Sequence, residues 1–273
     1  MSIPTEISGN TRLYAIIADP IHHVKTPQAI NALFRRRGQD RVMVPFHVPA
    51  EALAATVQGL RGLANLEGFI VTVPHKSAML ALCDRASAHA RAIGAVNAVR
   101  RTAAGELVGE MLDGLGFVAG LRQEGIEPAG MSVYLAGAGG AANAIAFALA
   151  EAGIARLTVA NRTAAKAEDL LQRLRQAYPA LPVARGSGDP SGHALVVNAT
   201  SLGLREHDPL PCHAERLSPE QVVAEIIMQP VHTPLLQAAA ARGCRIQPGL
   251  PMLLCQVELM ATAMGAPSGQ GRA

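Results

Sequence analysis

The sequence of 273 residues contains no tryptophan and few other aromatic residues, with three Tyr and five Phe. Proteins that stack nucleic-acid bases need aromatic side chains, so this class of binding surface is not expected. The formal net charge is only +3, which is too small to indicate a nucleic-acid partner. Charged residues make up 16% of the chain and hydrophobic residues 49%, which excludes a disordered tail or a highly charged coiled coil.

The four cysteines, Cys83, Cys212, Cys244 and Cys255, form no C-x-x-C pair. The N-terminus shows no basic and then apolar segment of the kind found in secretory signals. We therefore expect a cytoplasmic protein with reduced thiols. No pair of His or Cys has the spacing of metal ligands, so no metal is expected.

Residues 128–150 carry no charge and are long enough to suggest a membrane span. A cluster of Gly, Ser and Asn inside this stretch instead indicates a strand, a turn and a helix in series. We therefore expect no membrane partner.

The first hundred residues alternate short apolar runs with helical patterns, which is typical of a parallel sheet with crossover helices. Two further runs flank a turn at residues 102–105 and predict a hairpin or an edge pair. The first domain is expected to close near this turn. Strands are predicted at residues 13–18, 42–48, 69–73, 96–100 and 107–111, and helices at 27–36, 51–60 and from Lys76.

A second alternating series predicts another α/β unit. The final predicted helix is apolar on much of its surface, and packing back across the first domain would bury that surface. Strands are predicted at residues 133–136, 157–160, 194–198 and 222–227, and helices at 141–152, 164–177, 234–242 and 251–264.

The glycine-rich segment after the strand at residues 133–136 matches the G-x-G-x-x-G/A fingerprint of dinucleotide-binding proteins. Its glycines allow backbone N–H groups to approach a pyrophosphate at a helix N-terminus. The expected cofactor contacts are Gly137, Ala138, Gly139, Gly140 and Ala141.

The end of the next strand lies where an acidic residue would bind the ribose 2′-hydroxyl of NAD. The chain has Asn161, Arg162 and Thr163 there, with Lys166 one turn later, and no carboxylate. Cations suit a 2′-phosphate, so these residues favour NADP. Thr163 also stands where it would cap the following helix.

Several motifs in order along nearly the whole chain resemble the shikimate dehydrogenase family. They are DPIH at residues 19–22, VTVPHK at 71–76, IGAVN at 93–97, the glycine-rich loop, NRT at 161–163, NATSLG at 198–203 and GLPMLLCQ at 249–256. The resemblance implies an N-terminal substrate domain of residues 1–104, completed by about 245–273. It also implies an NADP-binding Rossmann domain of residues 105–244 and a last helix that returns to the first domain.

The resemblance also implies roles for individual residues. Lys76 and Asp113 would form the catalytic pair, and Asn161, Arg162 and Thr163 would hold the adenosine phosphate of NADP. Further cofactor contacts would come from Thr200 and Gly249. The implied substrate-binding positions are Val24, Thr26, Thr72, Asn97, Met228 and Gln256.

The chain departs from the family pattern where substrate should bind. Apolar Val24, Ile70 and Met228 stand where the family has Ser, Asn and Tyr, and Met111-Leu112 replaces Asn-Thr before Asp113. A site that loses polar groups binds a polyhydroxy acid less well. Lys25 either supplies a new positive charge that binds a substrate carboxylate or is a solvated residue of a loop.

We therefore expect an NADP-dependent enzyme that interconverts a cyclic hydroxy acid and its ketone. Lys76 and Asp113 would handle the hydroxyl proton, although the sequence does not say which is the formal base. The alternatives are a quinate or other alcohol dehydrogenase of the same family, or a non-catalytic NADP-binding regulator. The expected partner is a small-molecule substrate, and the chain would be a monomer or homodimer. Glu225 lies in an apolar strand, which indicates burial without assigning a role.

Overall fold

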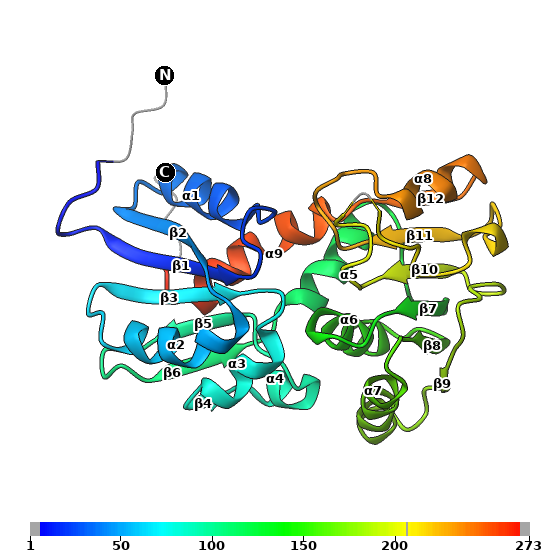
Figure 1. The fold of residues 1–273 in the computed structure, drawn as a ribbon, viewed down its shortest axis with the longest axis horizontal. Helices are drawn as coiled ribbons and strands as arrows, with labels where there is room; N and C mark the ends of the chain where they lie inside the picture. The colour runs from blue at the N-terminus through cyan, green and yellow to red at the C-terminus, as the bar shows by residue number, and fades with distance from the viewer. Residues whose placement is uncertain (1–5, 206, 268–273) are drawn as a thin grey trace. The chain divides into compact units, whose positions relative to one another are not determined.

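The computed structural model describes residues 6–205 and 207–267. The chain divides into two compact units. Unit 1 comprises the described residues up to Leu112 and those from Gln256 onward, and unit 2 comprises Asp113–Cys255. Each unit contains a six-stranded sheet with helices packed against it (Figure 1).

The sheet of unit 1 has the strand order β2-β1-β3-β5-β6-β4. Strand β1 lies in parallel between β2 and β3, and β5 is antiparallel to both β3 and β6. Burial of five consecutive residues at the end of β1 is typical of a central strand covered on both faces. The strands are β1 (Arg12–Ala18), β2 (Arg41–His47), β3 (Leu66–Val71), β4 (Arg85–Ala86), β5 (Ala98–Arg101) and β6 (Leu107–Glu110).

The helices of unit 1 are amphipathic elements that connect or cover these strands. Helix α1 has Pro27 in its first turn, where the missing N–H costs nothing, and it buries Ile30, Leu33 and Phe34. The helices are α1 (Thr26–Arg36), the 3₁₀ turn η1 (Ala50–Ala52), α2 (Leu53–Arg61), α3 (Lys76–Leu82) and α4 (Ala88–Ile93).

The last helix, α9 (Leu250–Ala263), begins in unit 2, and its residues from Gln256 belong to unit 1. Arg37, just after α1, forms an ion pair with Glu258 of α9. Its guanidinium also donates to the carbonyl oxygen of Pro267, 3.0 Å away. The predicted return of the final helix to the first part of the chain is therefore confirmed.

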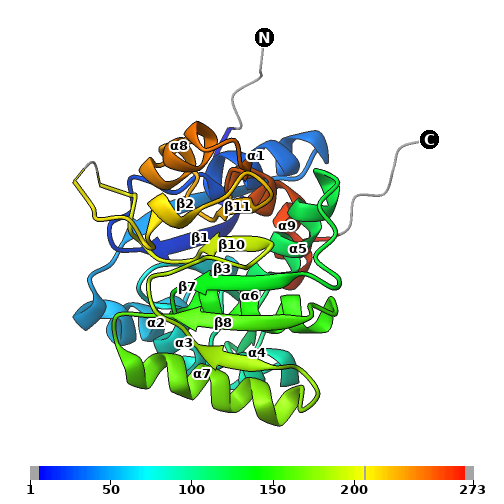
Figure 2. The ribbon, with the colours of Figure 1, turned by 90° about the vertical axis from the view of Figure 1, so that its right-hand side faces the viewer.

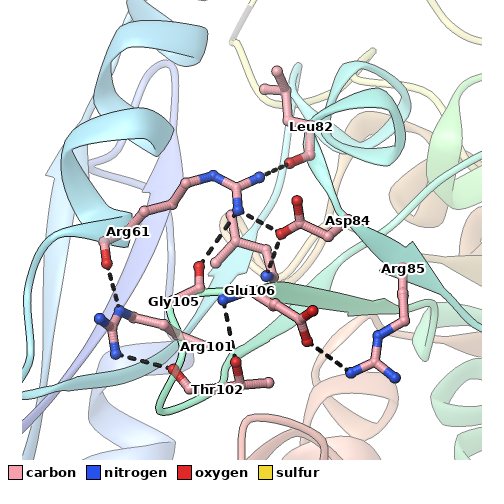
Figure 3. A network of polar contacts seen from close by, with 9 residues as sticks. Arg61, Leu82, Asp84, Arg85, Arg101, Thr102, Gly105 and Glu106 are labelled. Atoms are coloured by element: carbon pink, nitrogen blue, oxygen red, sulfur yellow. Dashed lines mark hydrogen bonds and ion pairs between the residues drawn. The ribbon is translucent and has the colours of Figure 1, made fainter.

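A polar network fastens the β5–β6 hairpin to α2 and to the segment before β4 (Figure 3). The Arg61 guanidinium pairs with Asp84 and donates to the carbonyl oxygen of Leu82, 2.8 Å away. Asp84 in turn accepts from the backbone N–H of Leu107 at 2.7 Å. Arg101 donates from Nε to the carbonyl oxygen of Arg61 at 2.8 Å. These contacts join residues that lie up to 40 positions apart in the sequence.

Unit 2 has the strand order β12-β11-β10-β7-β8-β9, and all its strand pairs are parallel. Figure 2 shows β11, β10, β7 and β8 side by side in this order. The carboxyl ends of these strands therefore share one edge of the sheet, which is where ligands bind in such folds. The strands are β7 (Ser132–Ala136), β8 (Arg156–Ala160), β9 (Val183–Arg185), β10 (Leu195–Asn198), β11 (Val222–Glu225) and β12 (Arg245–Gln247).

The helices of unit 2 bury the apolar faces of its sheet. All ten residues from Ala141 to Ala150 of α6 are buried, so this uncharged stretch is a core helix. In the described part of the chain, no helix is long and apolar enough to cross a membrane. The helices are α5 (Asp113–Gln123), α6 (Gly140–Glu151), α7 (Ala164–Ala177), the 3₁₀ turn η2 (Ala214–Arg216) and α8 (Pro234–Ala241).

The predicted mixed α/β architecture is confirmed, with two corrections in unit 1. Its sheet is not wholly parallel, because the β5–β6 hairpin enters it antiparallel to β3. Of the two predicted alternatives, the β5–β6 hairpin is confirmed and the edge pair is wrong, since the two-residue strand β4 pairs with β6 outside it. A strand of two residues has no periodicity that could be recognised in the sequence.

Candidate active site

Lys76 lies at the carboxyl end of β3 in unit 1. Strand β3 ends at Val71, two residues before the predicted end, and a turn closed by a 2.8 Å hydrogen bond from His75 N to Thr72 O leads into α3. The buried His75 ring places Nε2 2.8 Å from the carbonyl oxygen of Val48. Because a carbonyl can only accept, Nε2 carries the proton. Lys76 is the first residue of α3, and it is 9% exposed.

Asn97 connects the neighbouring strand to this turn. Its carbonyl oxygen accepts from the N–H of Val71 at 2.8 Å, and its own N–H donates to Glu110 O at 2.9 Å. Its side-chain Oδ1 accepts from the backbone N–H of Leu112 at 2.9 Å. Asn97 is 1% exposed, so this amide fixes the chain immediately before Asp113.

Asp113 begins α5 and is itself buried. The chain is assigned to unit 1 up to Leu112 and to unit 2 from Asp113. The predicted partners Lys76 and Asp113 therefore belong to different units, and their convergence on one hydroxyl stays a prediction.

Other predicted substrate-binding residues of unit 1 are buried or half-buried. Thr26 begins α1 and is buried with Val24, whereas Thr72 is half-buried in the turn before Lys76. Gln256 on α9 is 3% exposed, and its Oε1 has no hydrogen-bond partner in the described part of the chain. A buried acceptor without a donor is costly, so this amide is suited to a ligand that donates.

The glycine-rich loop of unit 2 has the geometry that a dinucleotide requires. Gly137 follows β7 with a φ of +116°, and its N–H donates to Ala160 O at 2.7 Å. A Cβ there would lie 2.8 Å from Ala199 O, so only glycine fits. Gly139 is the N-cap of α6, and Gly140 and Ala141 form its first turn, with Ala138 buried beside them. The residues therefore fit a pyrophosphate at this N-terminus.

The end of β8 presents cations to solvent. Asn161 Nδ2 donates to Thr163 O at 2.9 Å and so shapes the turn into α7. Arg162 and Lys166 are both exposed, and within the described ranges neither forms an ion pair with another residue. Thr163 occupies the N-cap position of α7, as predicted, but its side chain accepts no capping hydrogen bond.

Thr200, Met228 and Gly249 follow β10, β11 and β12 at the carboxyl edge of the same sheet. Thr200 donates from its hydroxyl to Asn198 Oδ1 at 2.7 Å. The predicted burial of Glu225 is confirmed, since it is 1% exposed. Its hydrogen-bond partner Asn198 was not predicted, although both residues are polar and end apolar strands.

The cysteines are free thiols. Burial raises the pKa of Cys83 to about 11 and that of Cys212 to about 12, so neither thiol ionises at neutral pH. Across residues 6–205 and 207–267 there is no group of three His, Cys, Asp or Glu side chains that could hold a metal.

Comparisons with known proteins agree with this arrangement. The family profile "Shikimate dehydrogenase substrate binding domain" matches residues 16–99, and "Shikimate / quinate 5-dehydrogenase" matches residues 122–187. A shikimate dehydrogenase (NADP(+)) of Rubrobacter xylanophilus is 43% identical over 94% of this chain and 91% of its own length. The chain belongs to the shikimate dehydrogenase family. The predicted family is therefore confirmed.

Two solved structures illustrate the range of this family. The shikimate dehydrogenase of Thermus thermophilus, in complex with NADP(H) and shikimate, is 31% identical over 95% of both chains, with a TM-score of 0.81. The 5-ketofructose reductase of a Gluconobacter species is 34% identical over 96% of both chains, with the same TM-score. The shikimate dehydrogenase fold is thus shared by relatives that act on different substrates.

Proposed function

We propose that this chain is an NADP-dependent dehydrogenase that interconverts a secondary alcohol and a ketone on a cyclic hydroxy acid of the shikimate class. The observation that carries the proposal is the placement of Lys76. It is a buried lysine that begins the helix after the central strand β3, and its carbonyl oxygen accepts from the N–H of Val96, the neighbour of Asn97. The family to which the chain belongs includes NADP-dependent dehydrogenases. A lysine needs a compensating function or partner to be buried in this way.

Unit 2 would hold the cofactor. The N–H groups at the start of α6 would bind the pyrophosphate, and Arg162 and Lys166 the 2′-phosphate, with Asn161 shaping their turn. Thr200 and Gly249 would contact the nicotinamide half from the ends of β10 and β12. NADP, when bound, supplies the hydride acceptor for alcohol oxidation.

Unit 1 would supply Lys76 and most of the residues that bind substrate. Lys76 and Asp113 would share the proton of the reacting hydroxyl, with Lys76 as the proton carrier and Asp113 as its charged partner. Asn97, Thr72, Thr26 and Gln256 would orient the ring by hydrogen bonds. The unsatisfied Gln256 Oε1 supports this role, because a substrate hydroxyl would supply the missing donor.

The substrate pocket would be less polar than the family pattern. Val24, Ile70, Met111 and Leu112 are buried, and Met228 is half-buried. Apolar side chains at these positions would favour a ring with fewer hydroxyl groups than shikimate. We further infer a cytoplasmic monomer or homodimer, consistent with four free thiols.

A second candidate substrate is an open-chain or cyclic polyhydroxy ketone. It is favoured by the 34% identity to a 5-ketofructose reductase over almost the whole chain. The apolar pocket positions argue against it, because a sugar would leave several hydroxyl groups unpaired.

The test is a panel of initial rates with NADP or NADPH. Shikimate, quinate, a deoxygenated shikimate analogue and 5-ketofructose would be compared by their kcat/KM values. We expect turnover of cyclic hydroxy acids, with the less hydroxylated ring preferred over shikimate. Turnover of 5-ketofructose alone would establish the second candidate instead, and NADP binding without turnover of any compound would indicate a regulator.

A further inference from the structure

Asn198 and Glu225 are the last residues of the neighbouring parallel strands β10 and β11, and they lie opposite each other in the register. Asn198 is fully buried and Glu225 is 1% exposed. Asn198 Nδ2 donates to Glu225 Oε1 at 2.7 Å. A carboxylate thus lies beneath the edge of the sheet where the cofactor is proposed to bind.

All the donors that surround this carboxylate are neutral. Oε1 also accepts from the Thr233 hydroxyl at 2.9 Å, and Oε2 accepts from the backbone N–H groups of Ile226 and Ile227 at 3.2 and 3.3 Å. No Lys, Arg or His of the described chain forms an ion pair with it. Burial raises the pKa of Glu225, and the hydrogen bonds from Asn198 and Thr233 oppose that shift. A buried acid without a cation is costly and is seldom the most stable choice for a core position.

One side of this network shapes the loop after β10. Asn198 Nδ2 also donates to Leu202 O at 2.9 Å, and its Oδ1 accepts from both the N–H and the hydroxyl of Thr200, at 3.0 and 2.7 Å. This loop lies against the dinucleotide loop, since a Cβ on Gly137 would be 3.3 Å from Thr200 Cγ2.

The other side shapes the segment after β11. Glu225 fixes the N–H groups that directly precede Met228. The Thr233 hydroxyl that donates to Glu225 also caps α8 by accepting from Leu236 N at 3.3 Å. A Cβ on Gly249 would lie 2.5 Å from Ile227 O, so the start of α9 packs directly on this segment.

The geometry points to Glu225 as a positioning residue that sets both loops of the cofactor site from beneath. Through Asn198 it orders the Thr200 loop against Gly137, and through Ile226, Ile227 and Thr233 it orders the segment that carries Met228 and supports Gly249. This inference rests on the proposed function, because it assigns these loops to NADP binding.

The test compares Glu225→Gln with Gln221→Met in the full chain. Gln221 is a matched control: it is buried directly before the first residue of β11, whereas Glu225 is the last, and it donates to Pro190 O and His193 O rather than to the loops of the proposed site. The Glu225→Gln amide keeps the volume but turns one acceptor into a donor facing other donors. NADP affinity would be measured by fluorescence titration well below the unfolding midpoint of each variant.

We expect Glu225→Gln to weaken NADP binding about tenfold, whereas Gln221→Met lowers the unfolding midpoint and leaves the dissociation constant unchanged. Wild-type NADP affinity in folded Glu225→Gln would overturn the inference. A wild-type chain that does not bind NADP would contradict the proposed function as well.

A second pair of variants covers the case in which Glu225→Gln does not fold. Thr233→Val removes the hydroxyl that donates a hydrogen bond to Glu225, and Thr233→Ser keeps this hydroxyl. We expect Thr233→Val to raise the NADP dissociation constant several-fold and Thr233→Ser to leave it near the wild-type value. Equal affinities in these two variants would contradict a positioning role.

Discussion

The backbone N–H of Val96 donates to the carbonyl oxygen of Lys76 across 2.9 Å. The next residue, Asn97, accepts from Val71, the last residue of the strand that leads to the lysine. Two segments separated by about twenty residues are thereby held in one arrangement. Hydrogen bonds therefore fix the backbone of the predicted proton carrier relative to that of a predicted substrate ligand.

The first prediction concerns the proposed catalytic pair. Lys76→Ala and Asp113→Asn should each reduce kcat by about 10²–10⁴-fold, because positioned acid–base groups contribute that much. The double variant should be little worse than the poorer single variant, since the two residues act as a unit. Steady-state rates and NADP titrations would check this. Ser77→Ala, an exposed neighbour on α3, serves as the control. Full activity in either single variant would show that the pair is structural.

The second prediction concerns the choice of cofactor. Arg162→Ala should weaken NADP binding by about 1.5–3 kcal/mol and leave NAD binding nearly unchanged, because only NADP carries the 2′-phosphate. Isothermal titration of both cofactors would measure this. Arg175→Ala removes an exposed cation from the last turn of α7 and should change neither affinity. Equal losses for NADP and NAD in Arg162→Ala would contradict the assignment.

The third prediction concerns the substrate. Restoring the family's polar residues together, by Val24→Ser, Thr26→Ser, Ile70→Asn and Met228→Tyr, should raise kcat/KM for shikimate relative to less hydroxylated rings. Thr26→Ser alone should matter least, because Thr26 already has a hydroxyl. If the wild-type chain turns over shikimate as efficiently as an ordinary biosynthetic enzyme, these residues do not restrict the pocket.

The fourth prediction concerns the network that fastens the hairpin of unit 1. Hydrogen bonds from Arg61 and from Leu107 N hold the pKa of Asp84 below its ordinary value of 3.8. A lowered pKa means that the ionised form stabilises the folded state at neutral pH, and that this contribution disappears as the pH falls through the folded-state pKa. The free energy of unfolding of wild type and Asp84→Asn should therefore differ most near pH 7 and converge below about pH 4.

The same network allows a matched comparison by urea denaturation. Arg61→Met should lower the free energy of unfolding by about 1–3 kcal/mol, because it removes the cation that pairs with Asp84 and the donor to Leu82 O. Glu106→Gln removes only the exposed pair with Arg85 and should cost less. An equal decrease in the free energy of unfolding in the two variants would show that Arg61 contributes no more to stability than a surface ion pair.

Much of this fold could be predicted because strong local signals coincide with buried elements. The apolar runs of β1 and β7 and the amphipathic pattern of α7 gave bounds within one or two residues of those observed. Helix α5 was missed because Gly114, Gly116 and Gly120 weaken the helical pattern. These small residues allow α5 to pack closely against α6, and this tertiary packing stabilises the helix: a Cβ on Gly114 would lie 2.1 Å from Ala144 O.

The candidate site shows a similar division between local and long-range information. The glycine-rich loop and the cations after β8 were readable because their chemistry is contained in a few consecutive residues. The pairing of Asn198 with Glu225 was not readable, because it depends on the register of two strands 27 residues apart. The hydrogen bond between Val96 and Lys76 is equally a product of tertiary packing.

Hydride transfer to NADP is the step that defines the proposed activity. A cyclic hydroxy acid that the panel identifies as a substrate would be deuterated at the carbon bearing the reacting hydroxyl, and the cofactor would be analysed by mass spectrometry after turnover by wild type and Lys76→Ala. We expect one deuterium in each NADPH formed by the wild type, in step with the ketone produced, and a rate reduced at least about 10²-fold in Lys76→Ala. Unlabelled NADPH, or labelled NADPH formed equally fast without Lys76, would contradict the proposed activity.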